Sequence, residues 1–173
     1  MANCRLAVVE DAAEVARLAR QLGYPASVEA MQSRLAALAA DPDQRVLVAV
    51  AGVDRAGEAN AAAADVAVGG ALEGWLHASA RLTLEAGASA EIVGLVVDGA
   101  ARQRGVGRAL VALAVQWAES RALPVVVVRS NVLRTQAHAF YPSLGFTRSK
   151  SQHVYVKALA GSLALPDGAP VHA

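Results

Sequence analysis

The sequence predicts an α/β (α+β) fold in which a mixed β-sheet is flanked by about four helices. Three observations favour this fold. Valine-rich runs bounded by turn residues are typical of buried strands, and two N-terminal segments carry apolar residues at helical spacing. A strand, a glycine loop, a long helix and a second valine run then follow one another, as in a right-handed crossover between parallel strands. The 173 residues suit one domain, which we expect at 1–159, followed by a disordered tail at 160–173.

The N-terminal half predicts two helices between strands. Asp11 is expected to begin the first helix, and Glu14 three residues later has the spacing of a capping box. Ser27 is expected to cap the second helix, which carries Val28, Met31, Leu35 and Leu38 on one face. The other elements expected in this half are strands at 5–9, 45–53 and 75–84 and a loop insertion at 57–70.

The C-terminal half predicts the crossover and a shorter helix. Gly94 interrupts the valine-rich strand expected at 91–98 and indicates a bulge there. Gly145 has the position of a left-handed residue that ends a helix at 135–144. The remaining expected elements are a helix at 108–120, a buried parallel strand at 124–129, and a last strand pair around Phe146 and 153–156.

Composition narrows the class of function. Cys4 is the only cysteine, which excludes an internal disulfide and any multi-cysteine metal site, and no metal is implied. A net charge of +1 offers no basic stripe for nucleic acid, while several arginines lie around one short loop. Without a long apolar segment or a secretory signal, we expect a soluble cytoplasmic protein that does not enter a membrane. The arginine cluster therefore favours a compact ligand that carries phosphate.

The short loop before the helix at 108–120 is the candidate phosphate site. Its pattern is Arg102-x-x-Gly105-x-Gly107, in which the glycines allow backbone amides to approach a pyrophosphate. The positive end of the helix attracts an anion, and Arg104 and Arg108 add charge. The pattern is loose, so the strand before it and the helix after it carry the prediction. The alternative is an ordinary tight turn with solvated arginines.

Two other nucleotide sites fit this loop poorly. A Walker P-loop needs a lysine and a hydroxyl residue after its glycines, and neither is present. A dinucleotide fold expects an acidic residue about 20 residues further on, at the end of the next strand, where this chain has Arg129.

The segments LVVD and RQRGVGRAL, followed by VRSNVLRTQAHAFYPSLGF, resemble the GNAT superfamily of N-acetyltransferases. Within it, SNVLRTQAHAFY is most similar to acetyltransferases of small amines, such as aminoalkylphosphonate N-acetyltransferase. The resemblance implies a sheet that is splayed between the parallel strands 91–98 and 124–129, with acetyl-CoA as cosubstrate wedged between them. The pantetheine arm can pair there with unpaired strand amides and carbonyls.

The resemblance also implies the residues that bind the cofactor. Asn131 is expected to hydrogen-bond the cofactor arm, and its alternative role is to cap a turn. A backbone amide of the strand 91–98 is expected to polarise the thioester carbonyl. The other expected cofactor-binding residues are Leu95, Val96, Val97, Arg102, Gln103, Arg104, Gly105, Val106, Gly107 and Arg108.

Four side chains are candidates for proton transfer or for contact with the acceptor. By resemblance, Tyr141 is expected to be the general acid toward the departing thiolate, and its alternative is a core aromatic. The resemblance also implies that Glu91 removes the amine proton through water, and its alternative is a solvated charge at the strand end. His77 is a substrate-binding candidate that could replace Glu91 as base, or a packed residue. His138 lies one helical turn before Tyr141 and is expected to orient it or to contact substrate. Pro142 departs from the family pattern and should kink the turn that presents Tyr141.

These residues together predict direct transfer of an acetyl group from acetyl-CoA to a primary amine of a small molecule. Two alternatives stay open: a non-catalytic CoA-binding or sensor domain, which Pro142 favours, and a peptide or protein N-acetyltransferase. The sequence leaves the oligomeric state open, with a homodimer as one alternative.

Overall fold

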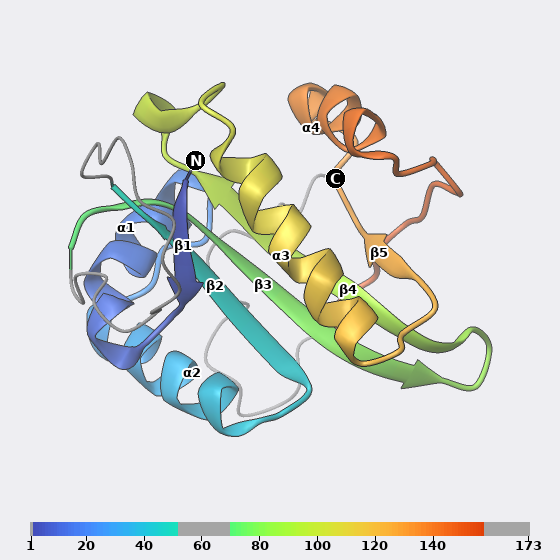
Figure 1. Ribbon diagram of the computed structural model, residues 1–173, viewed down its shortest axis with the longest axis horizontal. Helices are drawn as coiled ribbons and strands as arrows, with labels where there is room; N and C mark the ends of the chain where they lie inside the picture. The colour runs from blue at the N-terminus through green and yellow to red at the C-terminus, as the bar shows by residue number, and fades with distance from the viewer. Residues whose placement is uncertain (1, 52–69, 158–173) are drawn as a thin grey trace. The chain divides into compact units, whose positions relative to one another are not determined.

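The computed structural model describes residues 2–51 and 70–157 (Figure 1). Nearly all of the loop expected at 57–70, and the tail expected at 160–173, lie outside the described residues. The chain divides into two compact units, one up to Val128 and one from Arg129 onward, and each is described here by itself. The expectation of a single domain at 1–159 stays a prediction.

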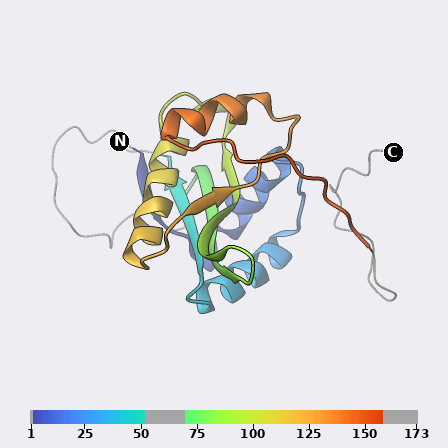
Figure 2. The ribbon, with the colours of Figure 1, turned by 90° about the vertical axis from the view of Figure 1, so that its right-hand side faces the viewer.

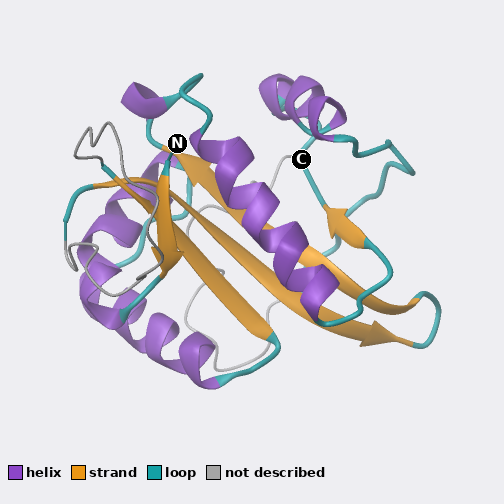
Figure 3. Ribbon diagram, in the orientation of Figure 1, coloured by secondary structure: helices purple, strands orange, loops and turns teal. Residues whose placement is uncertain are grey.

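The first unit contains a five-stranded mixed sheet with the order β1-β2-β3-β4-β5 (Figure 3). The first four strands pair antiparallel, and β4 pairs with β5 in parallel. The sheet and the helices confirm the predicted fold class. The strands are β1 Asn3–Leu6, β2 Gln44–Val50, β3 Leu72–Thr83, β4 Gly87–Val97 and β5 Val126–Val128.

Helices cover both faces of this sheet (Figure 2). The helices α1 Ala12–Gln21 and α2 Val28–Ala40 pack on one face, and α3 Val106–Ser120 packs on the other. Leu18 of α1 and Val48 of β2 are fully buried on the first face, together with apolar residues of α2. On the second face α3 lies close to β3 because Gly74 has no side chain, so the Val106 side chain can approach the strand.

A β-bulge lies in β4, as Gly94 indicates in the sequence. Gly94 pairs with His77, but the next residue of β3 pairs with Ile92, so Val93 is the extra residue. The ring of Trp75 covers Gly94, and a Cβ at residue 94 would lie 2.9 Å from its Cζ3 atom. The bulge therefore forms where a side chain on β4 would collide with the neighbouring strand.

The two expected helix caps have different outcomes. Ser27 caps α2 as predicted, because its Oγ accepts the Ala30 amide at 3.2 Å. The prediction of a capping box formed by Asp11 and Glu14 is wrong. A 3-10 turn at Val9–Asp11 gives Asp11 helical backbone angles, and its carboxylate accepts two hydrogen bonds from the Arg5 guanidinium at 2.6 and 2.7 Å instead of capping α1.

The second unit contains the helix α4 Thr135–Phe140 and a 3-10 turn at Pro142–Leu144. The helix expected at 135–144 with a kink at Pro142 instead ends at Phe140, because Pro142 lacks the amide of a regular helix and begins the 3-10 turn. Gly145 has the predicted left-handed conformation with φ of +88°. The prediction of a strand pair around Phe146 and 153–156 is wrong, because residues 146–157 contain no strand and Val154 to Val156 are exposed. A two-stranded pair is marginal unless one face is buried.

Candidate active site

The loop between β4 and α3 has the geometry of an anion site. Asp98 ends the strand and caps a 3-10 turn at Gly99–Ala101, its Oδ1 accepting the Ala100 amide at 3.0 Å. Gly105 is the N-cap of α3 with φ of +83°, and no atom of residues 2–51 or 70–157 outside its immediate neighbours lies within 4 Å of the position that its Cβ would occupy. Since Gly105 has no side chain, the first amides of α3 receive no side-chain cap in the described part of the chain. An anion can therefore reach these amides.

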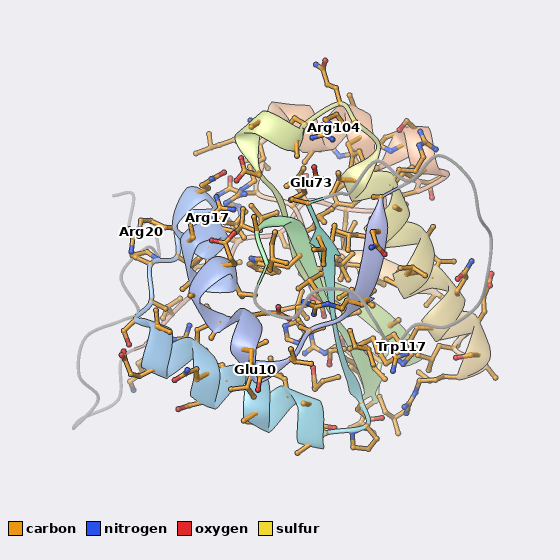
Figure 4. The ribbon with its side chains drawn as sticks, turned by 60° about the vertical axis from the view of Figure 1, so that its left-hand side comes forward. Glu10, Arg17, Arg20, Glu73, Arg104 and Trp117 are labelled. Atoms are coloured by element: carbon orange, nitrogen blue, oxygen red, sulfur yellow. The ribbon has the colours of Figure 1, made fainter. Side chains whose placement is uncertain are left out.

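The arginines of the loop differ in their surroundings. Arg102 and Arg108 are exposed on either side of Gly105. Arg104 is also exposed, but its Nη1 donates to Glu73 Oε1 at 2.8 Å, at the start of β3 (Figure 4). Gln103 has a left-handed backbone with φ of +62°, which is uncommon for a residue with a side chain. This strained turn lies directly before the amides that would face a phosphate, where strain is typical of functional loops.

The edge of β4 that faces β5 is paired over only part of its length. Among the described residues, β5 pairs with Ala90 to Ile92, so the stretch 93–97 has no strand partner on that side. This stretch includes Leu95, Val96 and Val97, which we expect to meet the cofactor arm. Their backbones pair with β3 on the other side, so the strand is held in place while one edge is left for a ligand.

Glu91 lies within β4 rather than at its end, because the strand begins at Gly87. The residue is 8% exposed and forms an ion pair with Arg81 of β3. The two side chains are diagonal neighbours, since Arg81 pairs with Ser89 and Glu91 pairs with Ser79. The alternative of a solvated strand-end charge therefore does not describe this residue.

His77 lies in the middle of β3 on the face that carries Trp75. Its Nε2 lies 2.8 Å from Gln44 Oε1, and with the Gln44 oxygen assigned toward the ring, Nε2 is the donor. Burial lowers the pKa of His77, so the imidazole is neutral at pH 7. A neutral ring can serve as a proton acceptor, but the contact with Gln44 also fits a packed residue.

In the second unit, Asn131 and His138 lie together. The Asn131 side-chain oxygen accepts the Leu133 amide at 2.9 Å. This is the turn-capping role that the sequence gives as the alternative to cofactor binding. His138 Nε2 lies 3.3 Å from the backbone oxygen of Asn131. His138 therefore contacts the Asn131 turn, and its role toward Tyr141 or substrate stays a prediction.

Tyr141 follows the last residue of α4 and lies between two aromatic rings. Its ring meets those of Phe140 and Phe146 edge to face, with centroids 5.1 and 5.6 Å apart. Burial raises the pKa of the Tyr141 phenol, against a smaller opposite effect of Arg134. The phenol is therefore protonated at neutral pH, as a general acid requires.

The sequence pattern did not indicate three residues that the structure adds to this site: Glu73, Trp75 and Arg81. Each acts through a neighbour on another strand or loop, by pairing with Arg104, covering Gly94 or pairing with Glu91. The alternation expected in the strand at 75–84 places Arg81 on one face with His77. Its meeting with Glu91 depends on strand register, which that alternation does not fix.

The comparisons with known proteins agree with this geometry. A family profile described as Acetyltransferase (GNAT) family matches residues 18–146. The chain belongs to the GNAT family of acetyltransferases. It is accordingly an acyl-CoA-dependent N-acetyltransferase with acetyl-CoA as its cosubstrate. The comparison with curated proteins gives no match.

Solved structures of acetyltransferases share the fold. Aminoglycoside N-acetyltransferase AAC(6')-Iy, in complex with a bisubstrate analogue, is 18% identical, with a TM-score of 0.73 over 92% of this chain and 99% of that chain. Glucosamine-6-phosphate N-acetyltransferase from Arabidopsis thaliana is 16% identical, with a TM-score of 0.72 over 90% and 98%. AAC(6')-IG from Acinetobacter haemolyticus is 20% identical, with a TM-score of 0.69 over 91% and 99%. No helix of the described residues is long and apolar enough to cross a bilayer.

Proposed function

We propose that this protein transfers the acetyl group of acetyl-CoA directly to a primary amine of a small molecule. The observation that carries the proposal is the start of α3, where a left-handed Gly105 leaves the first amides of the helix open to an anion between Arg102 and Arg108. These three residues would hold the diphosphate of coenzyme A. The open edge of β4 at Leu95 to Val97 would pair with the pantetheine arm.

The cosubstrate supplies an activated acyl group as a thioester. Glu91, or the neutral His77, takes a proton from the acceptor ammonium, through water in the case of Glu91, so that the nitrogen lone pair can attack the carbonyl carbon. A β4 amide donates a hydrogen bond to the carbonyl oxygen as negative charge develops there. Tyr141 donates its phenolic proton to the sulfur as the carbon–sulfur bond breaks, and the second proton that the nitrogen loses on forming the amide restores the phenol. A carbon–nitrogen bond replaces the carbon–sulfur bond, and no covalent enzyme intermediate is needed.

Small-molecule acceptors are supported by the fold relatives whose names give aminoglycosides and glucosamine 6-phosphate as substrates. The proposal extends this class of acceptor, an amine on a polar small molecule, to the present chain. The likeness of SNVLRTQAHAFY to aminoalkylphosphonate acetyltransferases adds a third kind of acceptor to test.

The test begins with titration calorimetry of acetyl-CoA and continues with thiol release in the presence of amines. The amines are an aminoglycoside, glucosamine 6-phosphate, an aminoalkylphosphonate and a mixture of peptides. We expect heat on titration, turnover with at least one small amine, and a loss of about 10²-fold or more in kcat for Tyr141→Phe with acetyl-CoA affinity unchanged. Absence of binding would refute the cofactor site.

The same assays separate the two alternatives. Binding of acetyl-CoA without turnover of any amine would favour a CoA-binding sensor, for which Pro142 beside Tyr141 is the supporting observation. Acetylated peptides in the absence of turnover with small amines, detected by mass spectrometry, would favour a peptide or protein acetyltransferase.

A further inference from the structure

A cluster of side chains from α1 lies beside the cofactor loop without belonging to it. Arg17 Nη1 donates to Asp98 Oδ2 at 2.5 Å, and Arg17 Nη2 donates to the backbone oxygen of Leu72 at 2.9 Å. Gln21 Oε1 accepts the Gly99 amide at 3.3 Å. One helix thus holds both the start of β3 and the residues that lead from β4 into the loop.

Arg17 is itself held in one orientation. Its Nε and Nη2 donate to the two carboxylate oxygens of Glu14 at 2.9 and 3.0 Å, and Glu14 Oε2 also accepts the Leu72 amide at 2.9 Å. The Arg17 side chain is 40% exposed, so solvent screens its charge only in part. A two-pronged contact with Glu14 leaves Nη1 aimed at Asp98 with little freedom.

Asp98 joins this cluster to the loop. One carboxylate oxygen accepts Arg17, and the other caps the 3-10 turn through the Ala100 amide. The ion pair therefore fixes the carboxylate that sets the first turn of the loop toward Gly105. Arg17, Asp98 and Arg104 also line one open pocket together with Glu73. Figure 4 shows Arg17, Glu73 and Arg104 on the same side of the unit.

We propose that Arg17 is a positioning residue for acetyl-CoA binding, which acts through Asp98 on the loop 99–105. The inference rests on the proposed cofactor site and adds to it a residue of α1 that does not touch the cofactor. Loss of the ion pair leaves Asp98 Oδ2 with only a long contact to Gln21 Nε2 at 3.5 Å. The turn at Gly99–Ala101 then samples other orientations, and the amides at Gly105 and beyond are less often in the binding geometry.

The test compares Arg17→Gln, Asp98→Asn and the double variant with Arg20→Gln as the matched control. Arg20 lies exposed on the same helix, so its substitution removes the same charge from α1 (Figure 4). Asp98→Asn keeps an oxygen for the Ala100 amide and loses the ion pair, and it leaves the contacts of Arg17 with Glu14 and Leu72 in place.

We expect Arg17→Gln and Asp98→Asn each to weaken acetyl-CoA binding about five- to tenfold in calorimetry, with the double variant no weaker than the poorer single variant. Amide hydrogen exchange at 99–105 without ligand should be faster in both. KM for acetyl-CoA should rise with kcat nearly unchanged, and Arg20→Gln should behave as wild type.

Equal affinity in Arg17→Gln and Arg20→Gln would overturn the positioning role, even if the melting temperature of Arg17→Gln is lower. Effects of the two single variants that multiply in the double variant would also overturn it, since Arg17 would then act independently of Asp98. Failure of the wild type to bind acetyl-CoA would instead refute the proposed cofactor site. Asp98→Asn keeps the test decisive if Arg17→Gln does not fold.

Discussion

Substitution of Gly105 by alanine separates the folding role of this glycine from its binding role. Gly105 has φ of +83°, and its Cβ position is open to 4 Å in the described part of the chain. The new methyl group would therefore meet no described side chain, and its folding cost is the strain of a left-handed alanine, about 1 kcal/mol. In a chain of this size that cost lowers the melting temperature by about 2–4 °C.

Gly23 provides a matched control at the end of α1. Gly23 has φ of +92°, and the space around its Cβ position is equally open in the described residues. Its amide donates to the backbone oxygen of Arg20 at 3.1 Å, at the C-terminal end of the helix. Gly23→Ala should therefore lower the melting temperature by a similar amount. Only Gly105→Ala places a methyl group beside the first amides of α3, where we propose that the diphosphate binds.

The assay is calorimetric titration of acetyl-CoA with both variants and the wild type at a temperature well below either melting point. We expect Gly23→Ala to bind as wild type and Gly105→Ala to bind about tenfold or more weakly, which corresponds to a loss of about 1.4 kcal/mol. Equal affinity in the two variants, at equal loss of stability, would refute the assignment of the α3 start as the diphosphate site.

Three further predictions follow from the same structure. Gly94→Ala should destabilise the protein by about 1–3 kcal/mol in urea unfolding, because its methyl group meets the Trp75 ring, and Gly94→Ala combined with Trp75→Leu should recover part of that loss. Burial lowers the pKa of His77, so as pH falls the imidazole is protonated in the unfolded chain at a higher pH than in the folded chain. The melting temperature should therefore fall as pH drops from 7 toward 5. His77→Gln should show a smaller fall. The raised pKa of Tyr141 predicts that kcat shows no loss from phenol ionisation below pH 10, whereas a decline centred well below pH 10 would argue against Tyr141 as the acid.

Local periodicity was enough to predict most of the first unit. The strands follow from valine-rich runs and, at 75–84, from alternation, and the first two helices follow from apolar residues about 3.6 positions apart. The helix α3 follows from a nearly continuous apolar stretch after the glycine loop. Ser27 was predictable as a cap because its Oγ bonds the amide three residues on, an interaction within one turn. The left-handed Gly145 was predictable for the same reason.

The capping box failed because both of its carboxylates have stronger partners than the local cap. The Asp11 carboxylate accepts Arg5 and the Val8 amide, and the Glu14 carboxylate accepts Arg17 one helical turn away and the amide of Leu72 on β3. Charged hydrogen bonds of this kind are stronger than the local cap that the sequence suggests. The ion pair of Arg81 with Glu91 was not predictable because it depends on strand register.

The bulge in β4 explains how one strand can carry both the proposed cofactor edge and the proposed base. Side chains alternate along a strand, so Glu91 and Val96, five positions apart, would face opposite sides of a regular strand. Their partners Ser79 and Trp75 both belong to one face of β3, which shows that the extra residue Val93 shifts the alternation by one. Glu91 is thereby turned to the face of His77 and Trp75, away from α3. If Val93 were paired regularly instead of bulged, Glu91 would lie opposite Ala80 and would turn to the α3 face, away from Arg81, so the position of the base candidate depends on the bulge.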